Sequence, residues 1–575
     1  MKTVFLFLSI LFSVSIGYAQ GFLKTSGTKI VNAKGENVLL RGIGLGGWML
    51  QEGYMLRVYR EAQQHRIRAR AEELIGVEKT QEFYDAWLKN HTTKADIDAM
   101  KSWGFNSVRL PMHFNLYTLP VDKEPVAGQN TWLEKGFALT DSLLAWCKAN
   151  QMYLILDLHA APGGQGNDLN ISDRDGSKPS LWESEAHQQK TIALWRKLAE
   201  RYKNEPWIAG YDVLNEPNWG FEDPQNDKNG LKEKGNVLLK KLMVDITKAI
   251  REVDQQHIII IEGNGWGNNY NGILPPWDKN MVLSFHKYWN YNNEQSIAHI
   301  LRFREQYQVP VWLGETGENS NVWFTEAIRL LETHNIGWAW WPLKKIGTNN
   351  PLEVLMNEGY AKVIEYWNDP KKEKPGAEQA YSGLMEMANS TRFDKNVYHK
   401  DVIDAMIRQP FSRETKPFNA NVLNVNTTIQ AVDYDLGING EAYYDMDTAN
   451  YRVSDPKKNT AGNKGRGGYR NDGVDIGNDD SHYVSDIETG EWLQYTIDVT
   501  QKGTYKLTLL VSAKQGNGKV GISLDGTNVG KELAVPAGNW QALDAGSITL
   551  SKGKHKLRVL AVAGGYNLKT VQLSK

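Results

Sequence analysis

The sequence contains only one cysteine, Cys147, among its 575 residues. No disulfide can therefore form within the chain, and its stability must come from packing. Cys147 falls in the amphipathic run Ala138–Asn150, so we expect it to be a small core residue rather than a nucleophile.

The sequence also lacks an excess of charge of either sign. Its formal net charge is −1 at pH 7, and its pI is near 6.9. This balance gives no electrostatic argument for binding to nucleic acid or to an anionic membrane. We therefore expect neither as a partner.

Long apolar runs are missing after the N-terminus, where no stretch reaches the roughly 18 residues of a membrane-spanning helix. The N-terminus itself has the three parts of a secretory signal: Lys2, the apolar segment Val4–Ile16, and the small-x-small site Gly17-Tyr18-Ala19. We therefore expect a signal peptide at residues 1–19 and a protein secreted to the extracellular space or the periplasm. Secretion without disulfides is more usual for bacteria than for eukaryotes.

Aromatic residues, in contrast, are abundant, with 20 Trp and 25 Tyr. Flat rings with a polar tip suit sugars, whose C–H faces stack on aromatics while their hydroxyls seek hydrogen bonds. We expect most of these rings to lie in hydrophobic cores, but such a large number of Trp and Tyr residues also suits a protein that binds carbohydrate. At 575 residues the chain is too long for one compact domain, and we expect two.

The first part of the sequence alternates strand-like and helix-like segments. Eight apolar runs are predicted as strands: Val38–Gly44, Ser107–Pro111, Tyr153–His159, Ile208–Leu214, His257–Glu262, Met281–His286, Val309–Leu313 and Ile336–Trp341. Helical runs separate them: Lys94–Trp103, Lys190–Tyr202, Val237–Val253 and Glu326–Thr333. Eight such units predict an α/β fold, a (β/α)₈ TIM barrel, in a catalytic domain spanning residues 20–410.

Two local features refine this prediction. Thr93 and Asp96 have the spacing of a capping box at the start of the first helical run. The charged stretch Arg57–Asn90 is interpreted as helical decoration with a solvated face.

The pattern changes after a polar connection, which we predict as a linker at residues 411–426. Short alternating runs are then separated by Gly, Asn and Asp turns: Glu491–Val499, Gly503–Ser512, Val520–Leu524 and His555–Val562. This pattern of short runs and turns predicts a C-terminal antiparallel β-sandwich of the jelly-roll type at residues 427–575.

Two glutamates carry the main functional signal. Glu216 in DVLNEPNW and Glu315 in PVWLGETG each follow a strand-like run, and a parallel barrel collects such strand ends on one rim. A pair of carboxylates about 5–5.5 Å apart is what a retaining glycosidase needs, one as acid/base and one as nucleophile. The string Asn204-Glu205-Pro206 repeats the tripeptide around Glu216, but it precedes a strand and so belongs to the opposite rim.

Residues at the other strand ends extend this signal, and together they resemble glycoside hydrolase family 5. Arg109 in SVRLP and Tyr288 in FHKYW match the residues that hold the nucleophilic carboxylate ionised and oriented. The resemblance implies that Glu315 is the nucleophile and Glu216 the acid/base.

The same resemblance implies substrate-binding roles for four further residues. His159 in LDLHAAPG and His286 in SFHKY match the histidines that line the sugar pocket. Asn215 matches the amide that binds the sugar 2-hydroxyl, and Trp341 in WAWWP matches the floor under the −1 sugar. The two histidines lie on separate strands without a further ligand pattern, so no metal is expected.

Within that family, the segment GLGGWMLQEGYM resembles exo-β-1,3-glucanases, in which the acid matching Glu52 grips the terminal glucose. The string HAAPGGQG is similar to their HGAPG segment. The match is partial, since Gly44 replaces an expected Asn and the strand-eight ending WWPLKK differs. Linkage therefore stays open between exo-acting β-1,3 and endo-acting β-1,4 hydrolysis, with mannan a distant third.

The C-terminal domain resembles a family 6 carbohydrate-binding module through GYRNDGVDI, TGEWLQY, GNWQ and GGYNLKTVQL. The resemblance implies that Tyr469 and Trp540 sandwich a sugar ring and that Asn567 donates the fixing hydrogen bond. Trp492 is expected in the core. The structural calcium of that family is doubtful here, because Gln430 and Val432 occupy the matching acidic positions and Asp433 and Asp435 alone do not make up for them.

These observations predict a secreted, retaining β-glucan hydrolase that needs no cofactor and acts as a monomer on a polysaccharide or oligosaccharide. A β-1,3-glucan is the expected substrate, and an endo-β-1,4-glucanase of the cellulase type is the alternative. A non-hydrolytic glycan-binding protein is the alternative from another class, and the presence of both glutamates with their supporting residues argues against it.

Overall fold

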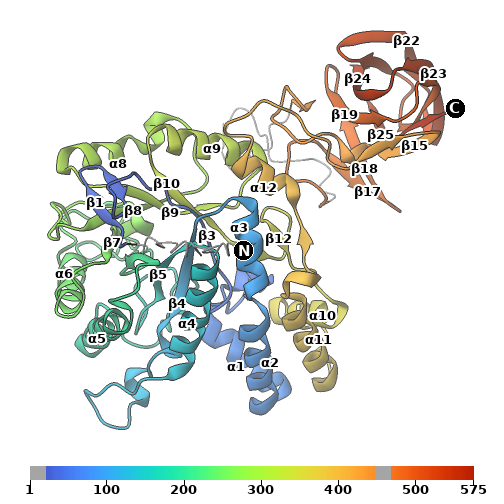
Figure 1. Ribbon diagram of the computed structural model, residues 1–575. Helices are drawn as coiled ribbons and strands as arrows, with labels where there is room; N and C mark the ends of the chain where they lie inside the picture. Colours follow the sequence, from blue (N-terminus) through green and yellow to red (C-terminus); the bar gives the residue numbers. More distant parts are fainter. Residues whose placement is uncertain (1–20, 447–467) are drawn as a thin grey trace, which may run out of the picture.

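The structure is a computed structural model of the chain, and it describes residues 21–446 and 468–575. The predicted signal peptide at residues 1–19 lies outside the described residues. Two bodies are visible, a helix-rich barrel and a sandwich of strands beside α9 (Asn321–Thr333) and α12 (Lys400–Ile407) (Figure 1).

The barrel is closed by eight parallel strands in the order β10-β3-β4-β5-β6-β7-β8-β9. Their bounds are β3 Arg41–Gly44, β4 Ser107–His113, β5 Tyr153–Ala160, β6 Ile208–Asp212, β7 Ile258–Glu262, β8 Met281–Lys287, β9 Val311–Gly317 and β10 Gly337–Trp341. All eight predicted strands are present. Each is buried along nearly its whole length, because helices cover its outer face and the barrel core fills the inner one.

Helices surround this barrel. Their bounds are α3 Lys94–Trp103, α4 Glu134–Ala149, α5 Glu185–Tyr202, α6 Val237–Arg251, α8 Glu294–Tyr307, α9 Asn321–Thr333 and α12 Lys400–Ile407, with a short turn α7 at Asn264–Gly267. Of the four predicted helices, α3 has the predicted bounds, α5 and α9 begin earlier than predicted, and α6 ends two residues earlier. The capping box of Thr93 and Asp96 is confirmed at the start of α3. Cys147 is a buried residue of α4, where burial raises the pKa of its thiol, as expected for a core residue.

Four helices form a second layer at the side of the barrel, near the bottom of Figure 1. They are α1 Gln64–Ile75, α2 Val77–Asn90, α10 Glu358–Asn368 and α11 Ala377–Ser390. The interpretation of Arg57–Asn90 as solvated decoration is incomplete, because Phe83 and Trp87 pack with Trp367 and Leu384 in a separate hydrophobic core. Only the outer faces of α1 and α2 meet solvent.

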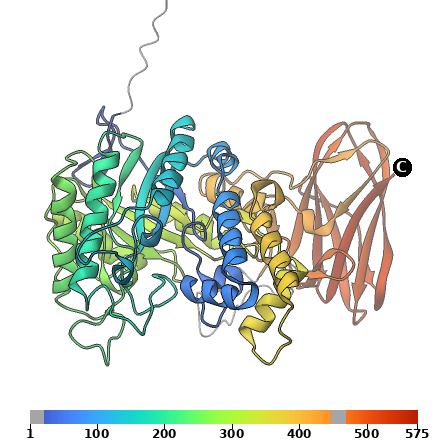
Figure 2. The ribbon, with the colours of Figure 1, turned by 90° about the horizontal axis from the view of Figure 1, so that it is seen from below.

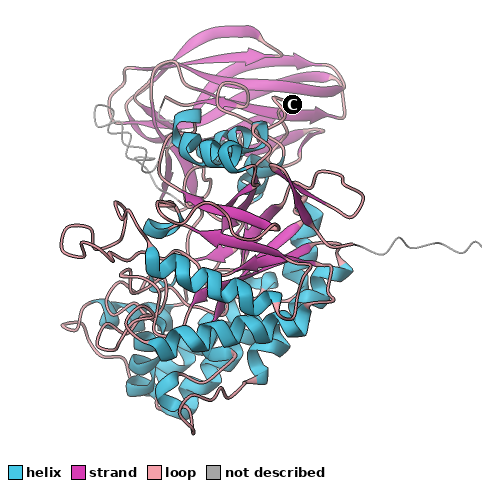
Figure 3. Cartoon of the chain, turned by 90° about the vertical axis from the view of Figure 1, so that its left-hand side faces the viewer, coloured by secondary structure: helices cyan, strands magenta, loops and turns pink. Residues whose placement is uncertain are grey.

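The C-terminal body is a sandwich of two sheets, drawn as the group of strands at the top of Figure 3. One sheet has the order β14-β19-β24-β21-β22 with β16 beside β19, and the other has the order β17-β18-β25-β20-β23 with β15 beside β25. The bounds are β14 Asn421–Leu423, β15 Asn426–Gln430, β16 Tyr443–Tyr444, β17 Ile476–Asn478, β18 His482–Ile487, β19 Trp492–Val499, β20 Gly503–Ala513, β21 Gly518–Leu524, β22 Thr527–Val535, β23 Gly538–Leu550, β24 Gly553–Ala563 and β25 Tyr566–Ser574.

The predicted linker at residues 411–426 contributes to this sandwich, since its strand β14 pairs with β19. The two bodies lie end to end in the view of Figure 2, with the α9 and α12 side of the barrel toward the sandwich in Figure 1. Minor strands complete the fold: β1 Lys24–Ser26, β2 Lys29–Val31, β11 Lys344–Lys345, β12 Leu352–Glu353 and β13 Val397–Tyr398. No helix among the described residues is both long and apolar enough to cross a membrane.

Candidate active site

The two glutamates meet at the rim formed by the carboxyl ends of the strands. Glu315 lies in β9, and Glu216 follows β6 by four residues with a left-handed backbone (φ 43°). Carboxylate oxygens of the two residues lie within 4.8 Å of each other. This separation is close to the spacing of a retaining glycosidase and well short of the about 6.5–9.5 Å that inversion requires.

Glu205, in the repeated tripeptide, lies on the opposite rim, as the sequence predicts. It falls between α5 and β6 and forms an ion pair with Lys148 at 2.7 Å.

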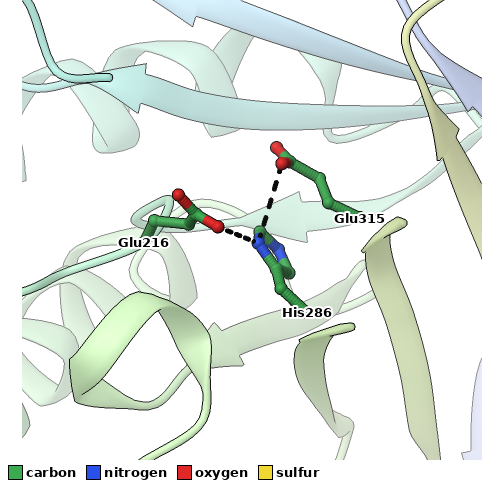
Figure 4. A group of neighbouring side chains, drawn as sticks. All are labelled: Glu216, His286 and Glu315. Carbon is green, nitrogen blue, oxygen red and sulfur yellow. Dashed lines mark hydrogen bonds and ion pairs between the residues drawn. The ribbon is translucent and has the colours of Figure 1, made fainter. Parts of the chain in front are cut away.

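His286 at the end of β8 joins the two glutamates (Figure 4). Its Nδ1 lies 2.6 Å from Oε1 of Glu216 and 3.7 Å from Oε2 of Glu315. Its Nε2 lies 3.2 Å from Glu262 Oε1. The surrounding carboxylates outweigh burial and raise the pKa of His286.

Arg109 and Tyr288 hold the carboxylate of Glu315. The guanidinium of Arg109 donates from Nη1 to Oε1 at 2.5 Å, and the Tyr288 hydroxyl donates to Oε2 at 2.9 Å. Burial opposes ionisation of Glu315, but the charges of His286, Arg109 and His159 and the Tyr288 hydrogen bond outweigh it and lower the pKa of this carboxyl. A carboxylate held ionised at neutral pH is suited to act as a nucleophile.

Glu216 experiences the opposite balance. Burial raises the pKa of its carboxyl, and the positive charge of His286 only partly offsets this. The environment therefore moves the pKa values of the two carboxyls in opposite directions. Glu315 is kept ionised and Glu216 is able to carry a proton, which is the division of roles that acid/base chemistry needs.

His159, Trp341 and Asn215 surround the space above this pair. The imidazole of His159 stacks on the Trp341 ring with centroids 5.1 Å apart and planes 2° apart. The amide oxygen of Asn215 accepts from Arg109 at 2.8 Å, and its Nδ2 lies 3.3 Å from Nε2 of His159. The Trp341 ring packs closely on Gly44. A Cβ at position 44 would lie 2.7 Å from the ring, so only glycine fits there.

Glu52 lies on the same rim and is 6 % exposed. One of its carboxylate oxygens is 3.7 Å from His159 Nε2. Burial raises the pKa of Glu52 to about 7, although His159 opposes the shift. The seven barrel residues that the sequence indicated beside the two glutamates therefore all lie around the glutamate pair.

Three buried carboxylates of this centre were missed by sequence reasoning. Asp157, Asp212 and Glu262 each lie within 3.3 Å of the Arg109 guanidinium. Asp157 also accepts a hydrogen bond from His159 Nδ1 at 2.8 Å, and Glu262 accepts the backbone N–H of Glu216 at 2.8 Å. An available signal was the acid at the end of an apolar strand, as in the string IIIIE before Gly263.

A cavity of about 550 Å³ opens on the same rim. Tyr59, Asp168, Lys228 and Trp266 are among its lining residues, and they come from the loops after β3, β5, β6 and β7. Neither Glu216 nor Glu315 is among its lining residues, but the backbone N–H of the lining residue Trp266 donates to Pro217 O at 3.1 Å.

Tyr469 and Trp540, the predicted sugar sandwich of the C-terminal body, each pack on a different residue of β18. Tyr469 packs on His482, whereas Trp540 packs edge-on against Tyr483 with centroids 5.0 Å apart. His482 and Tyr483 are neighbours in β18, and successive side chains of a strand point to opposite faces. Tyr483 is the ring in direct contact with Trp540.

Other polar groups surround Trp540. Its Nε1 donates to Asp479 at 2.8 Å, and Lys569 Nζ lies 5.0 Å from its ring centroid. Asn567 lies two residues before Lys569 on β25, where its Nδ2 donates to Ser512 Oγ at 3.1 Å. Trp492 is only partly buried, with the Arg558 guanidinium 3.9 Å from its ring centroid, so the expectation of a core residue is met in part.

The acidic residues considered for calcium are already hydrogen-bonded within the protein. Asp435 accepts from Thr496 and Gln494, and Asp433 accepts from Tyr469 and Asn419. In the barrel, Glu216, His286 and Glu315 form the one cluster of potential metal ligands in residues 21–446 and 468–575.

A closed eight-stranded barrel with two close carboxylates on its carboxyl rim is the arrangement of a retaining glycoside hydrolase. Comparison with known families agrees: residues 65–346 match the model of cellulase (glycosyl hydrolase family 5), and residues 468–575 match the carbohydrate binding module (family 6). The protein is a glycosyl hydrolase with a family 5 domain followed by a family 6 carbohydrate-binding module.

Its relatives include several glycosidases. A "Beta-xylosidase" of Phanerodontia chrysosporium is 29% identical over 377 residues, covering 59% of this chain and 74% of the relative. "Endoglucanase C" of Acetivibrio thermocellus is 25% identical over 367 residues, covering 53% and 91%. A "Probable glucan 1,3-beta-glucosidase A" of Emericella nidulans is 26% identical over 261 residues, covering 45% and 59%.

Solved structures that match part of this chain include an endoglucanase of Thermotoga maritima and a rutinosidase of Aspergillus niger. The first is 17% identical with a TM-score of 0.38, covering 60% of this chain and 96% of that chain. The second is 19% identical with a TM-score of 0.44, covering 54% and 91%.

Proposed function

We propose that this glycosyl hydrolase cleaves β-glucosidic bonds with retention of configuration, with Glu315 as nucleophile and Glu216 as acid/base. The observation that carries the proposal is the close carboxylate pair with opposite pKa shifts. In the first step Glu315 attacks the anomeric carbon while Glu216 protonates the departing oxygen. In the second step Glu216, now ionised, removes a proton from the water that releases the sugar from Glu315.

Neighbouring residues assist both steps of the proposed mechanism. Arg109 and Tyr288 keep Glu315 ionised and aligned before attack. His286 is hydrogen-bonded to Glu216 and close to Glu315, so it can balance their charge as the proton on Glu216 comes and goes. Asn215, fixed by Arg109, is placed to bind a sugar hydroxyl, and Trp341 supplies a flat apolar floor.

For the substrate we propose the non-reducing end of a β-1,3-glucan. Glu52, beside His159, offers a buried carboxyl to the hydroxyls of a terminal sugar. The cavity lined by Tyr59, Asp168, Lys228 and Trp266 opens on the same rim, which would leave room for the rest of the glycan. The similarity to a probable glucan 1,3-β-glucosidase supports this choice.

Two other substrates have a specific observation in their favour. Similarity to an endoglucanase over 91% of its length favours internal cleavage of a β-1,4-glucan. Similarity to a β-xylosidase favours a β-xyloside. Products from each glycan separate these cases: glucose from the first minutes on β-1,3-glucan supports exo action, whereas rapid loss of viscosity on carboxymethylcellulose selects the endo alternative.

Single substitutions test the proposed roles. Glu216→Ala should lower turnover by roughly 10²–10⁴-fold through loss of acid/base help, and Glu315→Ala should lower it further. With an activated aryl glycoside, added azide should rescue Glu216→Ala as the β-glycosyl azide, and Glu315→Ala as the α-azide or not at all. Glu205→Ala is the matched control, because the same tripeptide lies on the opposite rim. Near wild-type turnover of Glu315→Ala would reject the assignment.

We also propose that the protein is secreted as a monomer after removal of residues 1–19. N-terminal sequencing of the protein from culture medium or periplasm would test the cleavage before Gln20. The molar mass of the protein in solution, measured by light scattering, would test the oligomeric state.

A further inference from the structure

The loop between β9 and α9 is held by a residue of the C-terminal module. This loop, residues 318–320, leads directly from the strand that carries Glu315 to helix α9. The side chain of Asn471 donates from Nδ2 to Asn319 O at 2.9 Å and to Asn321 Oδ1 at 3.1 Å. Its carbonyl oxygen accepts the backbone N–H of Asn321 at 2.9 Å. One module residue therefore binds the loop on both sides of Ser320.

This contact is part of a buried polar network. Asp401 of α12 accepts from the backbone N–H of Asn471 at 2.9 Å and from Nδ2 of Asn321 at 2.8 Å. Asp472 accepts from the same Asn321 amide at 2.9 Å and from Arg470 at 2.6 Å. Asn471 is 0 % exposed and Asn321 is 1 % exposed. Buried groups of this kind are costly to leave unpaired, so the barrel and module fix each other here.

The same module segment lies near a second segment of the barrel. A Cβ placed on Gly468 would lie 3.9 Å from Thr348, which lies between β11 and β12. Lys345 of β11 pairs with Glu318 at 3.1 Å and so connects this segment to the loop after β9. The module therefore binds the loop after the strand of Glu315 and lies near the segment that follows β10 and β11.

We propose that Asn471 is a positioning residue for catalysis, acting through the loop after β9 on the carboxylate of Glu315. This inference rests on the proposed role of Glu315 as nucleophile. Only three residues separate Glu315 from Asn319, and Gly317 between them packs closely on β10, since a Cβ there would lie 2.5 Å from Trp341 O. A displacement of about 1 Å at a reacting group can cost 10²-fold in rate. The module then contributes to the chemistry as well as to docking on a glycan.

Kinetics of Asn471→Ala on a small soluble aryl β-glycoside test the proposal, since such a substrate needs no docking. We expect kcat to fall by roughly 10- to 100-fold with KM little changed. We also expect the acid limb of the pH profile to move to higher pH, because Glu315 is then held less tightly by Arg109 and Tyr288. Asn528→Ala is the matched control, an exposed amide on β22 of the same module. Its kinetics should equal those of the wild type.

Rates are expressed per active site, counted by mass spectrometry after covalent labelling with a 2-fluoro glycoside, so that misfolded protein does not enter the result. Asn471→Ser, which keeps a shorter donor, should lose less activity than Asn471→Ala. Wild-type kcat per labelled site and an unchanged pH profile in Asn471→Ala would overturn the inference and leave the proposed function intact. Failure of the wild type to hydrolyse any aryl β-glycoside or to be labelled at Glu315 would reject the proposed function, and the inference with it.

Discussion

The rim of the barrel and the surface around Trp540 both offer aromatic and charged groups, but they are built in opposite ways. On the rim, Arg109 is fully buried and its guanidinium lies among four carboxylates. Around Trp540, the ring is half-buried and its polar neighbours Asp479 and Asp480 lie in an exposed turn. Charge is therefore concentrated away from water in the first region and screened by water in the second.

This difference assigns different tasks to the two regions. Buried charges act strongly on each other and can shift the pKa of a reacting group, which a hydrolase needs. Exposed rings contribute stacking area, which suits binding to a glycan surface. Changes in the rim should therefore affect turnover and stability together, whereas changes near Trp540 should affect binding alone.

The largest effect is expected for Arg109→Met. This change leaves Asp157, Asp212 and Glu262 buried without their cation, and breaking a buried pair in this way costs about 3–5 kcal/mol. Activity should be lost as well, because Glu315 then loses the donor at 2.5 Å. Urea unfolding and hydrolysis of an aryl glycoside measure the two effects.

Arg196→Met is the control for that experiment. Arg196 forms an exposed ion pair with Glu252 at 3.0 Å, so its loss should change the free energy of unfolding by less than about 1 kcal/mol. Equal destabilisation by the two substitutions would contradict the contrast between buried and exposed charge.

A smaller effect is expected for Tyr288→Phe, and it should appear in the pH profile. Glu315 must be ionised to attack, so activity is lost as the pH falls through the pKa of this carboxyl. The Tyr288 hydrogen bond helps to lower that pKa. Its removal should move the acid limb upward by roughly one pH unit. The basic limb should stay in place, because it follows the raised pKa of Glu216.

Tyr381→Phe, on the exposed side of α11, should leave both limbs where they are. An acid limb that does not move in Tyr288→Phe would mean that Arg109 and the histidines alone hold Glu315 ionised.

Much of the barrel could be predicted from the sequence because each strand ends in a recognisable chemical signal. Alternation of apolar runs and helices indicated eight strands, and the rim of a parallel barrel brings their ends together. Asp157 lies inside β5 and Asp212 is the last residue of β6. Both were missed because no local pattern distinguishes a buried partner of Arg109 from a structural acid.

Contacts between the two bodies could not be predicted, since they depend on residues far apart in the chain. Asn321 and Asn471 are separated by 150 positions, and each looks like an ordinary polar loop residue. The same limit applies to the ring contacts of Trp540. Tyr469 meets His482 and Trp540 meets Tyr483 on β18, and both contacts join segments that are distant in the sequence.

The smallest effect concerns which tyrosine acts with Trp540 in binding a glycan. The test compares three rings of the module. Trp540→Ala and Tyr483→Ala should each weaken pelleting with an insoluble β-glucan by about tenfold, since aromatic anchors dominate such sites. Tyr469→Ala should instead lower the melting temperature, because its hydroxyl donates to Asp433 at 2.6 Å and its ring packs on the module core. Pelleting assays on folded protein, with melting curves for all three variants, separate binding from stability. Loss of binding in Tyr469→Ala with an unchanged melting temperature would support the sandwich predicted from the sequence and exclude Tyr483 as the partner of Trp540.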